Sequence, residues 1–179
     1  MILALSGPKG GGKDTIGEGL AKLFEADVDR FARKLYAMGA AFDPAIHPKM
    51  SHEDKEDWLL GDPELGTRRN FLEKLGTEFG REIIHPLLWV NAAIRDAYRL
   101  PTVLVDCRFE NESKAVRDVG GVVIHLRPDW TDFGRKHKSD HPLTVYPGDI
   151  VFKLTKGNYE DDLERLATLV ANQLKGDAR

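Results

Sequence analysis

Residues 2–15, ILALSGPKGGGKDT, join a short apolar run to a glycine-rich turn. Residues 2–5 are typical of a buried strand in a parallel sheet, because both faces of such a strand are covered. After the glycines, apolar residues recur at helical spacing over residues 13–24. A strand, a glycine loop and a helix in this order predict an α/β fold.

Four residues separate Gly7 from Gly12, and Lys13 follows, which is the spacing of a phosphate-binding loop. Successive glycines let backbone N–H groups converge on phosphate oxygens, and the start of the next helix adds a favourable dipole. Lys13 supplies a positive charge to the β- and γ-phosphates. We therefore predict that the phosphates of ATP are bound by Gly7, Lys9, Gly10, Gly11, Gly12, Lys13, Asp14 and Thr15.

Asp14 departs from the usual loop, which has Ser or Thr directly after the lysine. A carboxylate beside phosphates is repelled unless a metal ion or its water shell lies between them, so Asp14 is a candidate for water-mediated contact with Mg²⁺. The alternative is an ordinary acid of the first helical turn, stabilised by the helix dipole. Thr15 can still donate to an α-phosphate oxygen. The departure favours kinases over switch GTPases.

The chain has 179 residues, 41% of them hydrophobic, which predicts one domain with a substantial core. Its 26 basic and 29 acidic residues give a net charge of −3, so no global field favours nucleic acid or an anionic membrane as a partner. One cysteine, Cys107, excludes an internal disulfide and indicates a reducing compartment. The sequence has no signal-peptide pattern and no run of about 18 apolar residues, so we expect a cytoplasmic protein, in the host cytoplasm if the source is viral.

Further strands are predicted at residues 102–105, 121–126 and 150–154, with helices at 110–119 and 159–174. This alternation predicts a parallel sheet with right-handed crossovers. Residues 31–98 are helical in pattern, and 128–147 are polar, as in a surface loop or lid. We expect a single domain made of a core (1–30, 100–127 and 148–179), a helical part (about 31–99) and a lid (about 128–147).

Arginines indicate a second anion site. Arg69 and Arg81 lie on or beside one predicted helix, with Thr77 between them. Asp106 and Arg108 follow the strand at 102–105, at the edge where open α/β sheets bind ligands. Strand alternation would place both on one face, with Asp106 holding Mg²⁺ through water. The alternative is a buried Asp106–Arg108 pair that ties the strand to a helix.

An ordered set of motifs extends over nearly the whole chain. They are Gly12-Lys13-Asp14-Thr15, Arg69 and Arg81 around Leu75-Gly76-Thr77, Trp89-Val90, Asp106-x-Arg108-Phe109-x-Asn111-Glu112, Gly120-Gly121, Arg127-Pro128 and His137-x-Ser139-Asp140. With these motifs the chain resembles the phage deoxynucleoside monophosphate kinases, relatives of adenylate kinase and dephospho-coenzyme A kinase. It departs from the family pattern at Asp140, where Glu is common, at Leu154, where Asn is common, and before Trp89, where an acid is common.

The resemblance implies a P-loop kinase fold: three α/β/α layers around a parallel sheet, a helical part that binds the nucleoside monophosphate, and a short lid. It implies ATP as the phosphate donor, Mg²⁺ as the cofactor and small-molecule nucleotides as ligands. Relatives are often dimers, so a homodimer is one expectation, and the sequence leaves the oligomeric state open. The residues expected to be catalytic are Lys13, Arg69, Asp106 and Arg108. Those expected to bind substrate are Arg69, Thr77, Arg81, Trp89 and Arg108.

Cations in and before the polar loop are candidates for closing on the transferring phosphoryl group: Arg127, Arg135, Lys136 and Lys138. Nearby acids nearly cancel their charge, so an ordinary charged loop is the alternative. The histidines of this loop, His137 and His141, lack further ligands at zinc spacing.

Other residues have simpler interpretations. Trp89 or Phe31 could stack on an acceptor base, although tryptophans are more often core residues, as we expect for Trp58 and Trp130. Arg68 is expected to be a solvated helix charge.

An acceptor phosphate is already ionised near neutral pH, so its phosphorylation needs no general base. Arginines suited to phosphate, without a base dyad, favour a (deoxy)nucleoside 5'-monophosphate as acceptor and a diphosphate as product. A kinase of another small metabolite is the alternative, with Asp27 or Asp29 as base. A nucleotide-dependent switch or assembly ATPase would need a hydroxyl at position 14.

Overall fold

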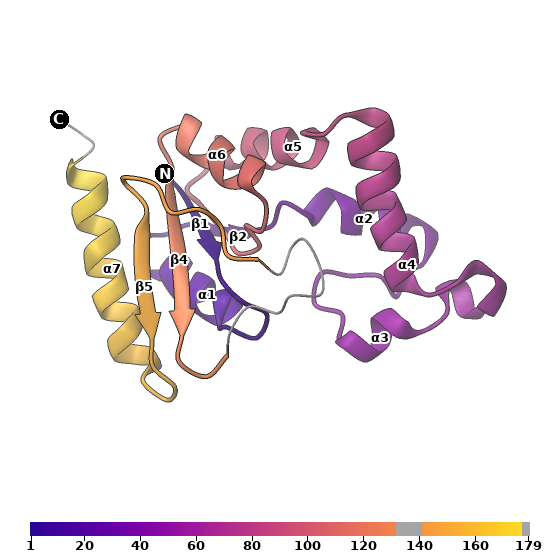
Figure 1. The fold of residues 1–179 in the computed structure, drawn as a ribbon, viewed down its shortest axis with the longest axis horizontal. Helices are drawn as coiled ribbons and strands as arrows, with labels where there is room; N and C mark the ends of the chain where they lie inside the picture. Colours follow the sequence, from indigo (N-terminus) through magenta and orange to yellow (C-terminus); the bar gives the residue numbers. More distant parts are fainter. Residues whose placement is uncertain (132–140, 177–179) are drawn as a thin grey trace. The chain divides into compact units, whose positions relative to one another are not determined.

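The computed structural model describes residues 1–131 and 141–176. They form two compact units (Figure 1). The sheet unit contains residues 1–30 and the chain from Ile94 onward, and the helical unit contains Phe31–Ala93. The helical unit is therefore an insertion in the sequence of the sheet unit.

In the described part of the chain, five parallel strands form one sheet in the order β2-β3-β1-β4-β5. They are β1 (Ile2–Ser6), β2 (Asp27–Asp29), β3 (Thr102–Leu104), β4 (Val122–Pro128) and β5 (Ile150–Leu154). β1 is central, with Ala4 beside Leu104 of β3 and Val123 of β4. The predicted α/β fold with a parallel sheet is confirmed. The short edge strand β2 was not predicted, because a three-residue Asp-Val-Asp segment has no apolar run.

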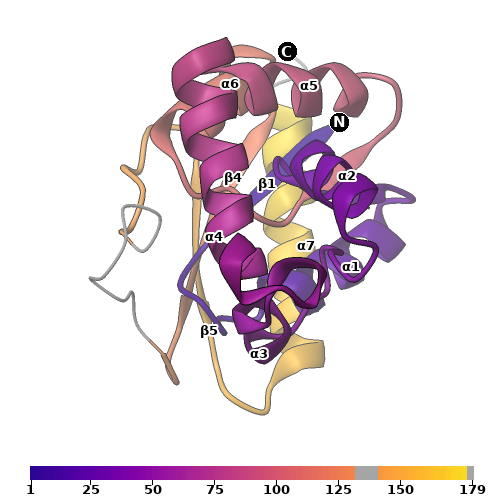
Figure 2. The same ribbon diagram turned by 90° about the vertical axis from the view of Figure 1, so that its right-hand side faces the viewer.

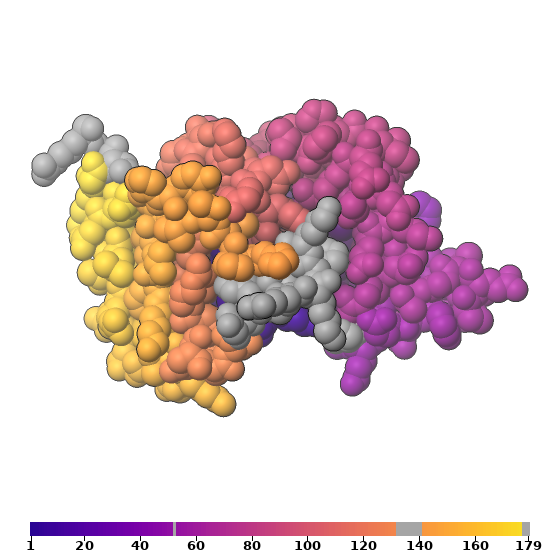
Figure 3. Space-filling model, viewed as in Figure 1, coloured from indigo at the N-terminus to yellow at the C-terminus, as the bar shows by residue number. Residues whose placement is uncertain are grey.

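Three helices cover the sheet: α1 (Lys13–Leu23), α6 (Glu110–Asp118) and α7 (Tyr159–Gly176). Helix α1 packs against β3 and α7, while α6 packs against β1 and β4. The crossover through α1 runs toward β2 and the one through α6 runs toward β4, so right-handed connections place these helices on opposite faces. In the space-filling view, α7 (yellow) lies beside β5 (orange) (Figure 3).

The core of the sheet unit is apolar and continuous. The buried side chains come from the sheet and from α1 and α7, and they include Leu3, Leu5, Leu20, Val103, Ile124, Leu126, Phe152, Leu166 and Val170. Gly17 lets α1 approach the sheet closely, because a Cβ atom there would lie 2.2 Å from the Val105 side chain. The start of α1 is thereby held firmly against the end of the sheet that carries the glycine loop.

A buried polar cluster fastens the segment before β5 to β4 and α6. Asp149 accepts hydrogen bonds from Arg117 Nε at 2.9 Å and from the backbone N–H of Tyr146 at 2.9 Å. It also accepts a hydrogen bond from Arg117 Nη2 at 3.1 Å and contacts His125 Nε2 at 2.9 Å. Burial opposes ionisation of Asp149, but these donors outweigh burial and hold its pKa below the ordinary value.

The helical unit contains short helices around a small core. In chain order they are α2 (Arg33–Phe42), α3 (His52–Glu56), the 3₁₀ turns η1 (Leu59–Gly61) and η2 (Pro63–Leu65), α4 (Arg68–Glu73) and the π-helical segment η3 (Lys74–Ile84). Helix α5 (Leu88–Ala97) begins in this unit. The buried core of the helical unit consists of Ile46, Met50, Leu59 and Leu72.

Helix α4 runs directly into η3 as one column (Figure 2). Gly76 and Gly80 on η3 are buried, and a Cβ at Gly80 would lie 2.6 Å from the Trp89 ring. Gly80 makes room for this indole, while Gly76 makes room for the Leu35 side chain. Over the described residues, no helix is both long and apolar enough to cross a membrane.

Candidate active site

The glycine loop between β1 and α1 has the backbone that its sequence requires. Gly10 and Gly12 have φ of 72° and 79°, which is the left-handed region that favours glycine. The N–H of Gly11 donates to Pro8 O at 3.1 Å, and the N–H of Ile16 donates to Gly12 O at 2.9 Å, which starts the helix. The loop therefore follows the carboxyl end of the central strand, where parallel sheets bind ligands.

Lys13 is folded back onto this loop. Its ammonium donates to Gly7 O at 2.8 Å and Pro8 O at 2.7 Å. The residue is only 8% exposed. Burial, followed by the nearby charge of Arg108, lowers the pKa of Lys13 to about 8. A buried ammonium with carbonyl partners keeps its full positive charge available to an anion.

Asp106 and Arg108 lie close enough to Lys13 to change its pKa, Asp106 raising it and Arg108 lowering it. The predicted reason for their position was wrong: β3 ends at Leu104, so strand alternation does not extend to either residue. The backbone N–H groups of Arg108 and Phe109 instead donate to the Glu112 carboxylate, at 2.8 and 3.1 Å. Arg108 is exposed and Asp106 is half-buried, which does not fit a buried pair that ties strand to helix.

Asp14 forms an ion pair with Arg30, the residue directly after β2. The Asp14 side chain is 63% exposed and that of Arg30 is 21% exposed. Arg30 was not predicted as a residue of the site. Its position after a short strand was the available signal, and it was missed because β2 itself was not predicted.

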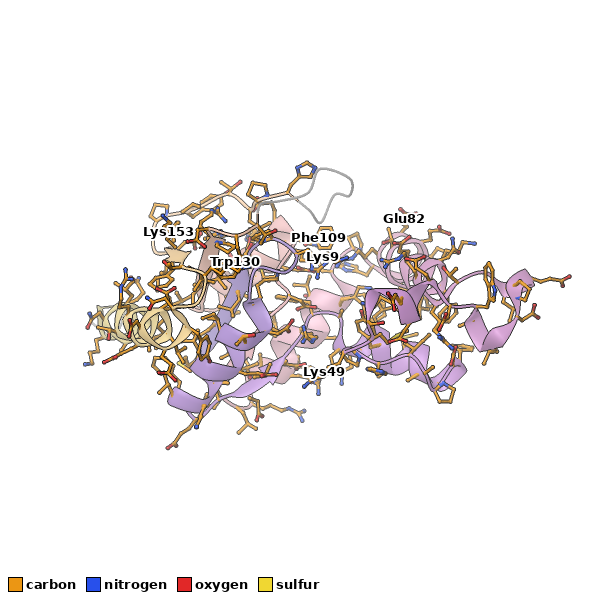
Figure 4. The ribbon with its side chains drawn as sticks, turned by 90° about the horizontal axis from the view of Figure 1, so that it is seen from below. Lys9, Lys49, Glu82, Phe109, Trp130 and Lys153 are labelled. Atoms are coloured by element: carbon orange, nitrogen blue, oxygen red, sulfur yellow. The ribbon has the colours of Figure 1, made fainter. Side chains whose placement is uncertain are left out.

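Trp130 lies against the glycine loop, which corrects its expected place in the core. It is 37% exposed, and its indole N–H donates to Gly10 O at 3.0 Å. A Cβ built on Gly12 would lie 3.6 Å from the indole ring and 3.8 Å from Leu154. Figure 4 shows Trp130 and Lys9 on the sheet unit, seen from below. Trp58, also expected in the core, is 48% exposed.

Two acids shape the loop that follows β5. The Asp129 carboxylate accepts the backbone N–H of Lys156 at 3.0 Å, and the buried Asp162 carboxylate accepts that of Thr155 at 2.7 Å. Tyr159, at the start of α7, donates its hydroxyl to Thr15 O at 3.2 Å. The loop after β5 and the start of α7 therefore lie beside the start of α1.

In the helical unit, the consecutive arginines Arg68 and Arg69 have different partners. Arg68 is 14% exposed and donates to Asp43 at 2.7 Å and Asp57 at 3.2 Å, so its expected place as a solvated charge was wrong. Arg69 is 33% exposed and pairs with Glu56 of α3. The pairing with Asp43 raises the pKa of Arg68, despite opposition from burial. Arg68 therefore stabilises the unit, while Arg69 remains partly accessible.

The other predicted acceptor residues lie on or next to η3. Thr77 is exposed and Arg81 is half-buried. Trp89 is 4% exposed, and its indole N–H donates to Gly76 O at 2.8 Å. This burial favours a packing role for Trp89 over stacking on a base. Phe31 is 2% exposed, so burial favours a packing role for Phe31 as well.

Of the predicted lid cations, only Arg127 falls in the described residues. It belongs to β4, which continues to Pro128, where the lid was expected to begin. Arg135, Lys136 and Lys138 lie outside the described residues, as does His137.

The acids near Lys13 suit a Mg²⁺ ion that keeps most of its own water. Within residues 1–131 and 141–176, no group of three or more His, Cys, Asp or Glu side chains could form a complete metal site. Mg²⁺ in phosphoryl-transfer sites is usually held by one or two carboxylates and the substrate phosphates. Asp14 and Asp106 fit that requirement.

The fold and the loop define an α/β protein with a lysine-bearing glycine loop at the carboxyl end of its central strand. No protein family profile matches the sequence. The chain is 27% identical over 128 residues to the deoxynucleoside-5'-monophosphate kinase of Escherichia phage T5. That match covers 66% of this chain and 50% of the relative, so the chain spans about half the length of the relative.

Proposed function

We propose that this protein transfers the γ-phosphoryl group of ATP to a deoxynucleoside or ribonucleoside 5'-monophosphate, giving ADP and a nucleoside diphosphate. The observation that carries the proposal is the ammonium of Lys13, buried on a glycine loop beside Arg108 and Asp106. The distant phage T5 relative, named as a deoxynucleoside-5'-monophosphate kinase, supports the same reaction. Supply of DNA precursors is the role that this reaction would serve.

The donor phosphates are bound by the loop amides and by Lys13. Phosphoryl transfer depends mainly on positioning and charge neutralisation, so a lysine that contacts the β- and γ-phosphates lowers the barrier without a covalent step. Thr15, exposed at the start of α1, donates to the α-phosphate. Asp14 and Asp106 hold the water shell of Mg²⁺, which adds positive charge at the β- and γ-oxygens when bound.

The acceptor is bound by arginines. Arg69 and Arg81 of the helical unit, with Thr77, bind the acceptor phosphate, and Arg108 of the sheet unit neutralises the transferring group. A phosphate acceptor needs no general base, and Asp29, a candidate base for an alcohol acceptor, already accepts the N–H of Arg30 at 2.7 Å. The arginines, which suit phosphate, favour a monophosphate over an alcohol as the acceptor.

A coupled assay of ADP formation tests the proposal. ATP and Mg²⁺ are supplied with each common deoxynucleoside and ribonucleoside monophosphate in turn, and with no acceptor. We expect ADP release that depends on at least one monophosphate and is lost in Lys13→Ala. Robust hydrolysis of ATP without acceptor would instead indicate an ATPase, and release of ADP only with a sugar or alcohol would indicate a metabolite kinase.

A further inference from the structure

Arg30 is a cation at the glycine loop to which neither the sequence motifs nor the proposed reaction assigns a role. Its backbone is fixed at the end of β2: its N–H donates to Asp29 Oδ1 at 2.7 Å, and Asp29 O accepts the N–H of Val105 at 3.1 Å. Asp29 lies beside Leu104 of β3, and Leu104 lies beside Ala4 of β1. Arg30 is therefore at the carboxyl edge of the sheet, the same edge as the glycine loop and Asp106.

The guanidinium of Arg30 points across this edge to the start of α1, where it pairs with Asp14. Its side chain is 21% exposed, so it is held in place while part of it remains reachable. The charge of Arg30 also contributes to lowering the pKa of Lys13, which means that the two cations are close neighbours electrostatically.

The pair with Asp14 can be exchanged at low cost. Because the Asp14 carboxylate is 63% exposed, the pair is close to a surface salt bridge, which contributes little to stability. Lys13, Arg30 and Arg108 gather at this edge with the acids Asp14, Asp29 and Asp106, and the exposed Asp14 is the acid that an added phosphate can replace. A planar guanidinium suits phosphate oxygens better than any other side chain.

We propose that Arg30 is a phosphate-binding residue: on ligand binding, its guanidinium exchanges the Asp14 carboxylate for an oxygen of the phosphoryl group bound beside Lys13. This deepens the proposed function, on which it rests for the identity of the phosphate as part of a nucleotide. In the unliganded protein Asp14 takes the place of that oxygen and keeps Arg30 oriented toward the loop.

Calorimetry in EDTA tests this without catalysis. The probes are inorganic pyrophosphate, the non-hydrolysable ATP analogue adenylyl imidodiphosphate, and a deoxynucleoside monophosphate. We expect Arg30→Gln to weaken binding of at least one probe about tenfold or more, because a hydrogen bond to a charged group is lost. Arg95→Gln is the matched control: it removes an equal charge from a 73% exposed arginine of α5 and should change affinity less than about twofold.

A double-mutant cycle separates phosphate binding from mere neutralisation of Asp14. If Arg30 binds phosphate, Arg30→Gln weakens binding in the Asp14→Asn background as well. If Arg30 only neutralises Asp14, Arg30→Gln has no effect in that background, and the proposal is overturned. Arg30→Lys, which keeps the charge but loses the planar fork, should bind with intermediate affinity, and thermal melts show that each variant folds.

The probes also identify the phosphate. Weakening of the ATP analogue alone assigns Arg30 to the donor, and weakening of the monophosphate alone assigns it to the acceptor. Normal affinity of Arg30→Gln for all three probes, beside normal ADP formation by the wild type, would overturn this inference and leave the proposed function standing. Weaker pyrophosphate binding in Arg30→Gln, with no acceptor-dependent ADP formation by the wild type, would support this inference and overturn the proposed function.

Discussion

The two units bury a cation in opposite ways. In the sheet unit, Lys13 donates to the carbonyl oxygens of Gly7 and Pro8, and its pKa falls to about 8. In the helical unit, Arg68 donates to the carboxylates of Asp43 and Asp57, and its pKa rises. Carbonyl dipoles orient a positive charge without cancelling it, whereas carboxylates cancel it. The first arrangement leaves a charge available to a ligand, and the second uses the charge to hold the fold together.

The same contrast separates the neighbours Arg68 and Arg69. Both lie in the first turn of α4, yet Arg68 is paired with a nearly buried Asp43, while Arg69 meets Glu56, whose side chain is 47% exposed. An ion pair in contact with water readily exchanges its carboxylate for another anion. Arg69 can therefore bind a phosphate, whereas Arg68 cannot do so without destabilising the helical unit.

Loss of the Lys13 charge should have the largest effect on activity. We expect Lys13→Ala to reduce turnover by about 10³-fold or more, because a charge that contacts the transferring phosphates is lost. The melting temperature should not fall, since the substitution removes a buried charge. Lys22→Ala, an exposed lysine on the same helix, is the control. A fall in stability without a fall in turnover would mean that Lys13, like Arg68, serves the fold.

Loss of the Arg68 charge should affect stability first. Arg68→Ala leaves Asp43 buried without its partner, which we expect to lower the free energy of unfolding by about 3 kcal/mol. Arg69→Ala should lower it by less than about 1 kcal/mol but raise KM for the acceptor. Urea unfolding of both variants checks the first statement and steady-state kinetics the second. Equal destabilisation by the two substitutions would contradict the assigned division of roles.

The lowered pKa of Lys13 predicts a pH dependence of donor use. Binding of phosphates needs the charged ammonium, so kcat/KM for ATP should fall above pH about 8, approaching tenfold per pH unit, since kcat/KM reports the unliganded enzyme. In Arg108→Gln the fall should begin at higher pH, because the Arg108 charge lowers this pKa.

Stability should respond to the same group in the opposite direction. Between about pH 8 and the ordinary lysine pKa of 10.5, the unfolded chain holds this proton more strongly than the folded protein, so the Lys13 contribution to stability improves as pH rises. A kcat/KM profile that is flat up to pH 10 would contradict the lowered pKa of Lys13.

Trp130 should give the smallest effect. Its indole donates to Gly10, so phosphates that bind at the loop should change its fluorescence. Trp130→Phe should remove that signal and weaken ATP binding a few-fold, because one neutral hydrogen bond contributes about 1 kcal/mol. Trp58→Phe, which changes an exposed indole of the helical unit, should keep the signal. A signal that disappears with Trp58 instead would dissociate Trp130 from the donor loop.

The sheet unit could be predicted from sequence because its signals are local. β5 begins and ends at the predicted residues, and α1 and α6 each differ by one residue at their carboxyl ends. The glycine spacing alone locates Lys13. What could not be predicted depends on contacts distant in sequence: Arg30 meets Asp14 across the sheet edge, and Trp130 meets Gly10 across the fold.

The helical unit was predictable only as a class of structure. Helical periodicity indicates the helices but not the π-helical turns of η3, nor the packing of Gly76 against Leu35 and of Gly80 against Trp89. Arg68 was misjudged for a similar reason, since its partner Asp43 precedes it by 25 residues in a separate segment.

The central position of β1 has a consequence for synthesis on the ribosome. Of the five strands, β1 is synthesised first, but its neighbours in the sheet begin only at Thr102 and Val122. The apolar residues of β1 therefore stay unpaired until the helical insertion and both of these strands have been synthesised. Closing so long a loop makes folding slow, and the waiting strand is a target for aggregation or chaperones. The helical unit, whose internal contacts lie within residues 31–93, emerges during that interval.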